Sequence, residues 1–204
     1  MTDIIALTGG IASGKTTICS LFVKNYHIPI IDTDIIARHL LTTDKALLQQ
    51  LNQQFNQQLL DQQGQLKRQK LRDIIFSHQH QRQKLNQLLH PKIYQQVVIQ
   101  IQKISQQYMY CIIAIPLLIE TFSMSQEYLN IQRVIVIDCD QKTQIQRVMQ
   151  RDHISQQQAS KILKIQASRI QRLEIADDII YNDQNMQHLQ QQVDLLHNSY
   201  QILL

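Results

Sequence analysis

A glycine-rich segment near the N-terminus constrains the fold of this chain more than any other feature of its sequence. Three of the four glycines fall within six residues, in the run Gly9-Gly10-Ile11-Ala12-Ser13-Gly14-Lys15-Thr16. The apolar run 4–8 leads into this segment, and apolar residues at helical spacing follow it. A buried strand, a glycine turn and a helix in this order are typical of a loop that binds phosphate groups.

Each fixed position of this G-x-x-x-x-G-K-T pattern matches a requirement of a polyphosphate. Glycine lets the backbone approach closely, so successive N–H groups form an anion-binding nest at the positive end of the following helix. We expect Lys15 to reach the β- and γ-phosphates and the Thr16 hydroxyl to ligate Mg²⁺. The predicted nucleotide-binding residues are Gly10, Ala12, Ser13, Gly14, Lys15, Thr16 and Thr17. The alternative is a glycine-rich turn that opens an ordinary helix, but the full pattern seldom arises by chance, least of all between a strand and a helix.

Composition and charge exclude several classes of function. The chain has 204 residues, enough for one domain or a core with insertions. Its formal net charge of +4 is scattered, which gives no support for a nucleic-acid partner. No apolar run approaches the about 18 residues of a membrane span, and no signal peptide is recognisable. The single cysteines Cys19, Cys111 and Cys139 favour reduced core thiols and a cytoplasmic protein.

Short apolar runs that alternate with helical patterns predict a three-layer α/β fold with a parallel sheet. The expected strands are 4–8, 28–31, 109–115 and 133–137, with a last short strand near 179–182. The expected helices outside the long helical stretch are 14–25, 141–151, 155–173 and 186–200. Ser155 and Gln158 form a capping-box pattern at the start of the third of these.

The stretch from Arg38 to Gln107 is almost wholly helical and too long for a simple crossover. We expect it to be a helical insertion between the second and third strands. Turn residues predict breaks in it near Asp61-Gln62-Gln63-Gly64 and at Pro91.

Carboxylates at the end of the second strand are candidates for the acceptor side of a phosphoryl transfer. Asp34 follows Asp32 at the carboxyl edge, where open parallel sheets bind their ligands. A carboxylate there can accept the proton of an attacking hydroxyl or help to hold Mg²⁺. The alternative is that Asp32 or Asp34 is the N-cap of the next helix.

Other polar residues have two interpretations each. Arg147 and Arg151 lie four apart and can point into one cleft to stabilise transferred phosphate, or they are solvated surface residues. Glu120 follows the third strand and either orients substrate or begins a surface helix. His90, before Pro91, is either a structural turn residue or a substrate contact. A basic group either attracts an anionic acceptor or forms a solvated face; it comprises Lys67, Arg68, Lys70 and Arg72.

Together these motifs resemble the dephospho-CoA kinase family from about Ile4 to Tyr200. Beyond the loop the matching blocks are Ile31-Asp32-Thr33-Asp34-Ile35-Ile36-Ala37-Arg38, Leu88-Leu89-His90-Pro91, Pro116-Leu117-Leu118-Ile119-Glu120, Gln150-Arg151-Asp152, Gln166-Ala167-Ser168-Arg169 and Ala176-Asp177-Asp178-Ile179-Ile180-Tyr181-Asn182. The resemblance implies a P-loop kinase with a nucleotide-binding core, an insertion for the CoA moiety and a helical lid. The expected ranges are 1–37, 108–140 and 169–204 for the core, 38–107 for the insertion and 141–168 for the lid.

The resemblance also implies an activity: phosphorylation of the 3′-hydroxyl of the dephospho-CoA ribose by ATP with Mg²⁺, the last step of coenzyme A biosynthesis. Asp34 would be the base, while Lys15 and the lid arginines Arg147 and Arg151 would stabilise charge. Thr16 would ligate the metal, and the predicted substrate-binding residues are Asp34, His90 and Glu120. We expect a monomer or a weak oligomer.

Ala12 departs from the family pattern, which usually has glycine at this position. Alanine tolerates positive φ poorly, so the loop must either keep Ala12 in an ordinary region or bear some strain. We expect no loss of function, because interior positions of such loops accept varied residues.

Three rival functions remain open. A nucleoside or nucleotide kinase would share the loop, the aspartate and the arginines. A GTPase switch would explain the D-x-x-G match at 61–64, but no N-K-x-D motif occurs and no strand pattern precedes the match. A nucleotide-binding regulator would bind ATP without turning it over.

Overall fold

The computed structural model describes residues 2–56, 58–77, 79–104, 107–119 and 129–203. The chain divides into two compact units. The first comprises Met1–Asp32 and Gln100–Leu204, and the second comprises Thr33–Ile99. Each unit buries apolar side chains of its own.

The first unit contains a sheet of five strands in the order β2-β3-β1-β4-β5. The strands are β1 (Asp3–Gly9), β2 (Ile30–Asp32), β3 (Tyr110–Ala114), β4 (Ile131–Asp138) and β5 (Asp178–Tyr181). All four pairings are parallel, which confirms the predicted parallel α/β sheet. The carboxyl ends of parallel strands meet at one edge, so Gly9, Asp32 and Asp138 stand at the same edge of the sheet.

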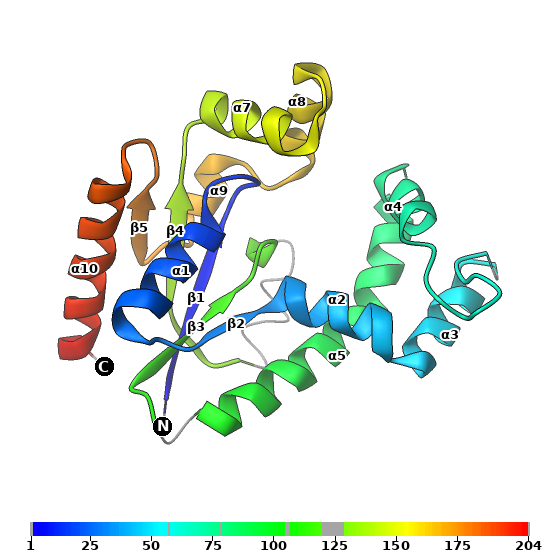
Figure 1. Cartoon of the computed structure of the whole chain (residues 1–204), viewed down its shortest axis with the longest axis horizontal. Helices are drawn as coiled ribbons and strands as arrows, with labels where there is room; N and C mark the ends of the chain where they lie inside the picture. The colour runs from blue at the N-terminus through cyan, green and yellow to red at the C-terminus, as the bar shows by residue number, and fades with distance from the viewer. Residues whose placement is uncertain (1, 57, 78, 105–106, 120–128, 204) are drawn as a thin grey trace. The chain divides into compact units, whose positions relative to one another are not determined.

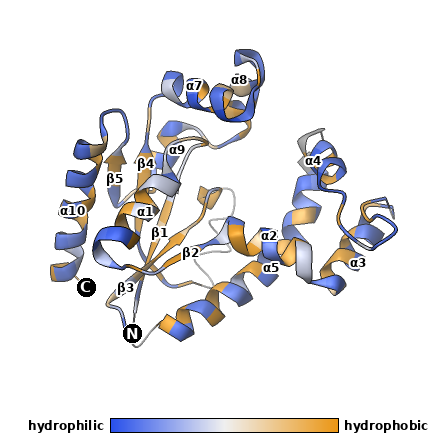
Figure 2. Ribbon diagram, viewed as in Figure 1, coloured by the Kyte–Doolittle hydropathy of each residue, from blue (hydrophilic) through white to orange (hydrophobic). Residues whose placement is uncertain are grey.

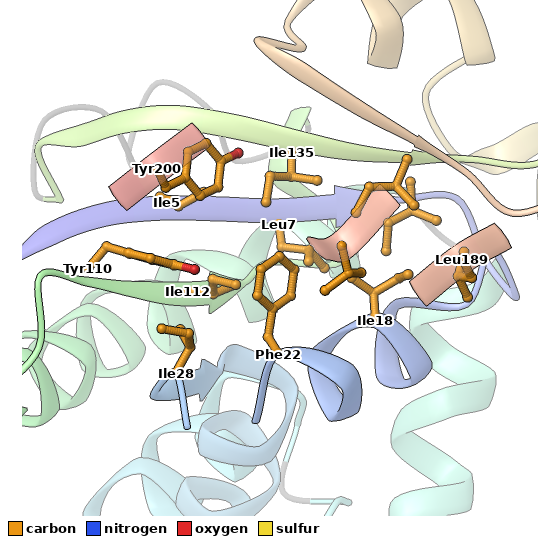
Figure 3. Close-up of a cluster of buried hydrophobic side chains, with 13 residues drawn as sticks. Ile5, Leu7, Ile18, Phe22, Ile28, Tyr110, Ile112, Ile135, Leu189 and Tyr200 are labelled. Atoms are coloured by element: carbon orange, nitrogen blue, oxygen red, sulfur yellow. The ribbon is translucent and has the colours of Figure 1, made fainter. Parts of the chain in front are cut away.

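One face of this sheet is covered by α1 (Lys15–Tyr26) and α10 (Met186–Leu203), which contact each other. Helical spacing places Ile18 and Phe22 of α1 on the buried side, where they meet Ile5 and Leu7 of β1 (Figure 3). Strand residues that point to the opposite face are buried as well; they include Ala6, Cys111, Ile113, Val134 and Val136. The strands are therefore apolar on both faces, as parallel strands require.

The hydropathy of the residues agrees with this burial of the strands beneath helices. The strands carry mostly hydrophobic colour, whereas much of α10 and of α7 (Gln141–Asp152) is hydrophilic (Figure 2). Among the helices that the structure describes, none combines the length and apolar character needed to cross a membrane.

The predicted helix 155–173 is wrong in one respect, because it is two helices. α8 spans Gln156–Ile165 and α9 spans Arg169–Glu174. Gln166 leaves the helix with an extended backbone, and Ser168 then opens α9 through a capping box of its own. The predicted capping box at Ser155 and Gln158 is confirmed.

The second unit is helical (Figure 1). Its helices are α2 (Thr33–Thr43), α3 (Lys45–Gln54), α4 (Arg68–Ser77) and α5 (Gln79–Ile104), the last of which ends in the first unit. Its core includes Leu40, Leu47, Leu51, Leu59, Leu71, Leu85 and Leu89. The Asp44 side chain caps α3 by accepting from the Leu47 N–H, and its other oxygen pairs with Lys92 Nζ at 2.6 Å. This ion pair ties the start of α3 to α5.

The predicted break at Pro91 is wrong, since α5 continues through it. Proline removes one backbone hydrogen bond, but buried Leu89 and Ile93 on either side anchor the helix. His90 is therefore a helical residue rather than a turn residue. Its ring lies edge-on to Tyr94, with centroids 6.3 Å apart, and burial lowers its pKa.

The predicted break near residues 61–64 is confirmed as a turn between α3 and α4. Asp61 Oδ1 accepts from the N–H groups of Gln63 and Gln65 at 2.9 and 2.8 Å, and Gly64 has φ +76°. The Asp61 carboxylate therefore shapes its own turn, which is a structural role unlike that of a GTPase switch.

Candidate phosphate-binding site

The glycine-rich loop connects β1 to α1 in a backbone conformation that needs its glycines. Gly14, the N-cap of α1, has φ +103°. A Cβ atom at Gly9 would lie 2.6 Å from Ser13 Oγ and 2.7 Å from the Ile137 carbonyl oxygen. Ala12 has φ +56°, so of the two expectations for this residue the strained one holds.

Lys15 folds back over the loop. Its Nζ donates to the carbonyl oxygens of Gly9 and Gly10 at 2.7 and 3.1 Å. The next residue, Thr16, is exposed, and Thr17 is half-buried. An ammonium and a hydroxyl thus stand together at the start of α1, where the helix dipole already favours an anion.

Two glutamines hold the backbone of Ile11. Gln144 of α7 donates from Nε2 to the Ile11 carbonyl oxygen at 2.8 Å. Gln166, in the connection between α8 and α9, accepts from the Ile11 N–H at 2.9 Å. Gln144 is only 4% exposed. Both backbone polar groups of this loop residue are thus satisfied by side chains distant in sequence.

The next two carbonyl groups of the loop also accept side-chain hydrogen bonds. Asn182, which follows β5, donates from Nδ2 to the Ser13 carbonyl oxygen at 2.6 Å. Arg147 of α7 lies 3.4 Å from the Ala12 carbonyl oxygen and 3.4 Å from that of Asn182. Arg147 therefore stands beside the loop, where its charge can act on a bound phosphate.

Arg151 makes a different contact from Arg147, although both are on α7. Its guanidinium pairs with the neighbouring Asp152 through two hydrogen bonds of 2.8 Å, and this pairing raises its pKa. The structure thus places Arg147 against the loop and Arg151 on an exposed ion pair.

The arginines of α9 lie near the carboxyl edge of the sheet. Arg169 pairs with Asp138, the last residue of β4, over 2.5 Å. Arg172 lies close to Gly10, where an added Cβ atom would be 3.1 Å from its Nη2. A pocket opens beside this guanidinium; it is lined by Thr8, Gly9, Gly10, Pro116, Leu117, Leu118, Ile119, Gln166, Ala167 and Arg172.

The predicted acceptor-side residues fall in several places. Asp32 ends β2 in the first unit and is half-buried, whereas Asp34 is the exposed second residue of α2 in the second unit. His90 also belongs to the second unit, and Glu120 lies outside the described residues. Within the described ranges, no three His, Cys, Asp or Glu side chains gather as a metal-binding group.

The three cysteines are free and have raised pKa values. Burial raises the pKa of Cys19 to about 12 and that of Cys111 to about 11. Burial also raises the pKa of Cys139. Such thiols stay protonated at neutral pH, which agrees with the prediction of core thiols rather than reactive ones.

Sequence reasoning missed the side chains that hold the loop. Asn182 had a usable signal, because it follows a strand whose carboxyl end lies at the ligand edge. Gln144 precedes Arg147 by one helical turn and so shares its face. Gln166 begins one of the blocks that match the family, but its contact with the loop could not be read from the sequence, since only the break between α8 and α9 brings it there.

Comparison with known proteins places this chain in a family. The family model described as dephospho-CoA kinase matches residues 3–188. Dephospho-CoA kinase from Vibrio vulnificus is 42% identical over 200 residues, covering 98% of this chain and 96% of the relative. The dephospho-CoA kinase of Pasteurella multocida is 42% identical over 204 residues, with coverage of 98% and 96%. A solved structure of dephospho-CoA kinase from Campylobacter jejuni superposes with a TM-score of 0.72 at 25% identity and covers 100% of both chains.

Proposed function

The chain belongs to the dephospho-CoA kinase family, and from this premise we propose that it transfers the γ-phosphoryl group of ATP to the 3′-hydroxyl of the dephospho-CoA ribose. The products are coenzyme A and ADP. The observation that carries the proposal within the structure is the loop between β1 and α1, with Lys15 folded over it and Arg147 beside it.

Lys15 and Arg147 stabilise the negative charge of the phosphate groups. As a nucleotide enters, Lys15 Nζ exchanges its two carbonyl partners for phosphate oxygens, which carry full negative charge and bind an ammonium more strongly. Arg147 then offers its guanidinium to the phosphoryl group in transit. Arg151 can contact the phosphates only if its ion pair with Asp152 breaks. Breaking an exposed ion pair costs little free energy.

Asp34 is the proposed general base. It stands two residues beyond the carboxyl end of β2, and its side chain is exposed. The carboxylate accepts the proton of the 3′-hydroxyl as that oxygen attacks the γ-phosphorus, and the bond from phosphorus to the bridging oxygen breaks to release ADP. His90 and Glu120 complete the proposed substrate-binding residues.

The donors at the start of α1 fit a magnesium ion. Mg²⁺ prefers oxygen ligands and usually keeps water and phosphate oxygens around it, so it needs few protein ligands. The exposed Thr16 hydroxyl supplies one such oxygen. When bound, the ion would neutralise charge on the phosphates.

We further propose the division into a core (1–37, 108–140 and 169–204), an insertion that binds the CoA moiety (38–107) and a lid (141–168). The partner is a small molecule, without nucleic acid or membrane, and the protein is a monomer or weak oligomer. Its free cysteines support a cytoplasmic location, where thiols stay reduced.

The test is whether ATP consumption depends on the acceptor. Purified protein with Mg²⁺ and ATP is incubated with dephospho-CoA, with a nucleoside, or with no acceptor, and ADP and the phosphorylated product are quantified. We expect ADP and coenzyme A in equal amounts with dephospho-CoA alone. Phosphorylation of the nucleoside with dephospho-CoA left untouched would favour the rival kinase, and nucleotide binding without any turnover would favour a regulator.

A further inference from the structure

We propose that Gln144 and Gln166 are positioning residues of the phosphate loop, which hold the two peptide groups of Ile11 and so keep the loop in its nucleotide-binding conformation. The inference rests on the proposed function only in taking the loop to bind nucleotide. It concerns side chains that act through the backbone and do not touch the reacting atoms.

The two hydrogen bonds grip opposite sides of one residue. Gln144 Nε2 donates to the Ile11 carbonyl at 2.8 Å, and Gln166 Oε1 accepts from the Ile11 N–H at 2.9 Å. The carbonyl belongs to the peptide group between Ile11 and Ala12, while the N–H belongs to the peptide group before Ile11. Two successive peptide planes are therefore oriented from outside the loop.

This grip explains how Ala12 keeps a left-handed backbone. Its φ of +56° describes rotation about the bond that directly follows the peptide group held by Gln144. An alanine left to itself would return to negative φ, because its Cβ crowds the backbone in the left-handed region. The buried Gln144 amide opposes that return, since the rotation would leave both it and the Ile11 carbonyl unpaired.

The two glutamines also connect the phosphate loop to both ends of the α7–α8 segment. Gln144 lies in the first turn of α7, and Gln166 directly follows α8. The two ends of the α7–α8 segment, whose helices contact each other, thus meet at a single loop residue. A displacement of either end would be passed to the loop backbone through a hydrogen bond.

A pair of isosteric substitutions separates the two roles. Gln144→Glu replaces the donating amide with an oxygen, whereas Gln166→Glu retains the oxygen that accepts from Ile11. Each adds one negative charge near the loop, so the difference between them isolates the hydrogen bonds. We expect ADP affinity, measured by titration calorimetry, to fall about tenfold more in Gln144→Glu than in Gln166→Glu. Equal losses would overturn the proposal.

Alanine variants with matched controls test the same point without added charge. Gln144→Ala and Gln166→Ala should each weaken ADP binding about fivefold or more. Gln146→Ala on α7 and Gln157→Ala on α8, both exposed, should leave it unchanged. Unchanged ADP affinity in the first two variants, with only a lower melting temperature, would show a merely structural role.

Relief of the strain at Ala12 provides a rescue. Glycine adopts positive φ readily, so Ala12→Gly should recover part of the ADP affinity lost in Gln144→Ala. In turnover assays KM for ATP should rise in Gln144→Ala while KM for the acceptor stays constant. No recovery in the double variant would contradict the link between Gln144 and Ala12.

The failure of this proposal and the failure of the proposed function can be told apart. ADP binding is measured without an acceptor, so a wild-type protein that is inactive on dephospho-CoA would refute the proposed function alone.

Discussion

Lys15 Nζ donates to the carbonyl oxygen of Gly9 over 2.7 Å, six residues back along the chain. The ammonium therefore lies over the loop, and the carbonyl groups of Gly9 and Gly10 stabilise its charge. Binding of a nucleotide exchanges these partners rather than immobilising a free side chain, so less conformational entropy is lost at that moment.

Replacing Lys15 tests its role in charge stabilisation. Lys15→Met keeps the length of the side chain and removes its charge, and we expect phosphoryl transfer to fall at least about 100-fold. Lys24→Met, on the exposed side of the same helix, is the control and should retain full activity. Steady-state rates with saturating acceptor provide the measurement, and less than a threefold loss in Lys15→Met would contradict the assignment.

Two neighbouring carboxylates can be distinguished by amide substitution. Asp34→Asn should lower kcat about 10² to 10⁴-fold without changing ADP affinity, because a general base acts on the acceptor proton. Asp32→Asn should have a much smaller effect on kcat. If Asp32→Asn caused the larger loss, the base would have to be reassigned to the strand end.

The two arginines of α7 should differ in importance. Arg147 stands 3.4 Å from the Ala12 carbonyl oxygen, whereas Arg151 pairs with Asp152. We expect Arg147→Ala to reduce kcat/KM for ATP about tenfold more than Arg151→Ala. A larger loss in Arg151→Ala would mean that Arg151 leaves its ion pair to reach the phosphates.

Gly14 tolerates no side chain. An added Cβ atom would lie 2.0 Å from Asn182 Nδ2, and φ is +103°. Gly14→Ala should lower the free energy of unfolding by about 1–3 kcal/mol and abolish ADP binding. Adding Asn182→Gly removes the steric clash but keeps the backbone strain and loses the hydrogen bond to the Ser13 carbonyl oxygen, so it should restore stability only in part. Full restoration in thermal unfolding would show that the clash alone matters.

His197 predicts a pH dependence of stability. Its Nδ1 lies 2.7 Å from the Tyr110 hydroxyl, its ring stacks on Tyr26 at 3.8 Å, and burial lowers its pKa below the ordinary 6.5. The unfolded chain therefore binds a proton first as pH falls below 6.5, which favours unfolding. Asp194 opposes this effect, so it limits the shift.

Denaturant unfolding between pH 7.5 and 5 measures this contribution. The free energy of unfolding should fall as pH drops below 6.5, by at most about 1.4 kcal/mol per pH unit from this one group. His197→Gln should flatten the profile, while His80→Gln, at an exposed position, should not. The half-buried His90, whose pKa is also lowered by burial, would account for a slope that persists in His197→Gln.

Local sequence predicted those elements whose hydrophobic pattern reflects how they are buried. The apolar runs of β1 and β3 are buried on both faces, and a parallel sheet is the arrangement that buries such runs. The wrong boundaries arose where packing outweighed local preference. Pro91 stays helical because its neighbours are anchored in a core, and the single predicted helix divides at Gln166, which bonds to the loop instead of continuing its helix.

The sequence by itself determined that a phosphate loop joins the first strand to the first helix, because glycine, lysine and threonine are each required there by backbone geometry or charge. Only the tertiary structure decided how that loop is held. Gln144, Gln166 and Asn182 reach it from segments 133, 155 and 169 residues away, and such distances leave no periodicity to detect. Their hydrogen bonds form because the fold brings polar side chains to backbone N–H and carbonyl groups of the loop that would otherwise be left unpaired.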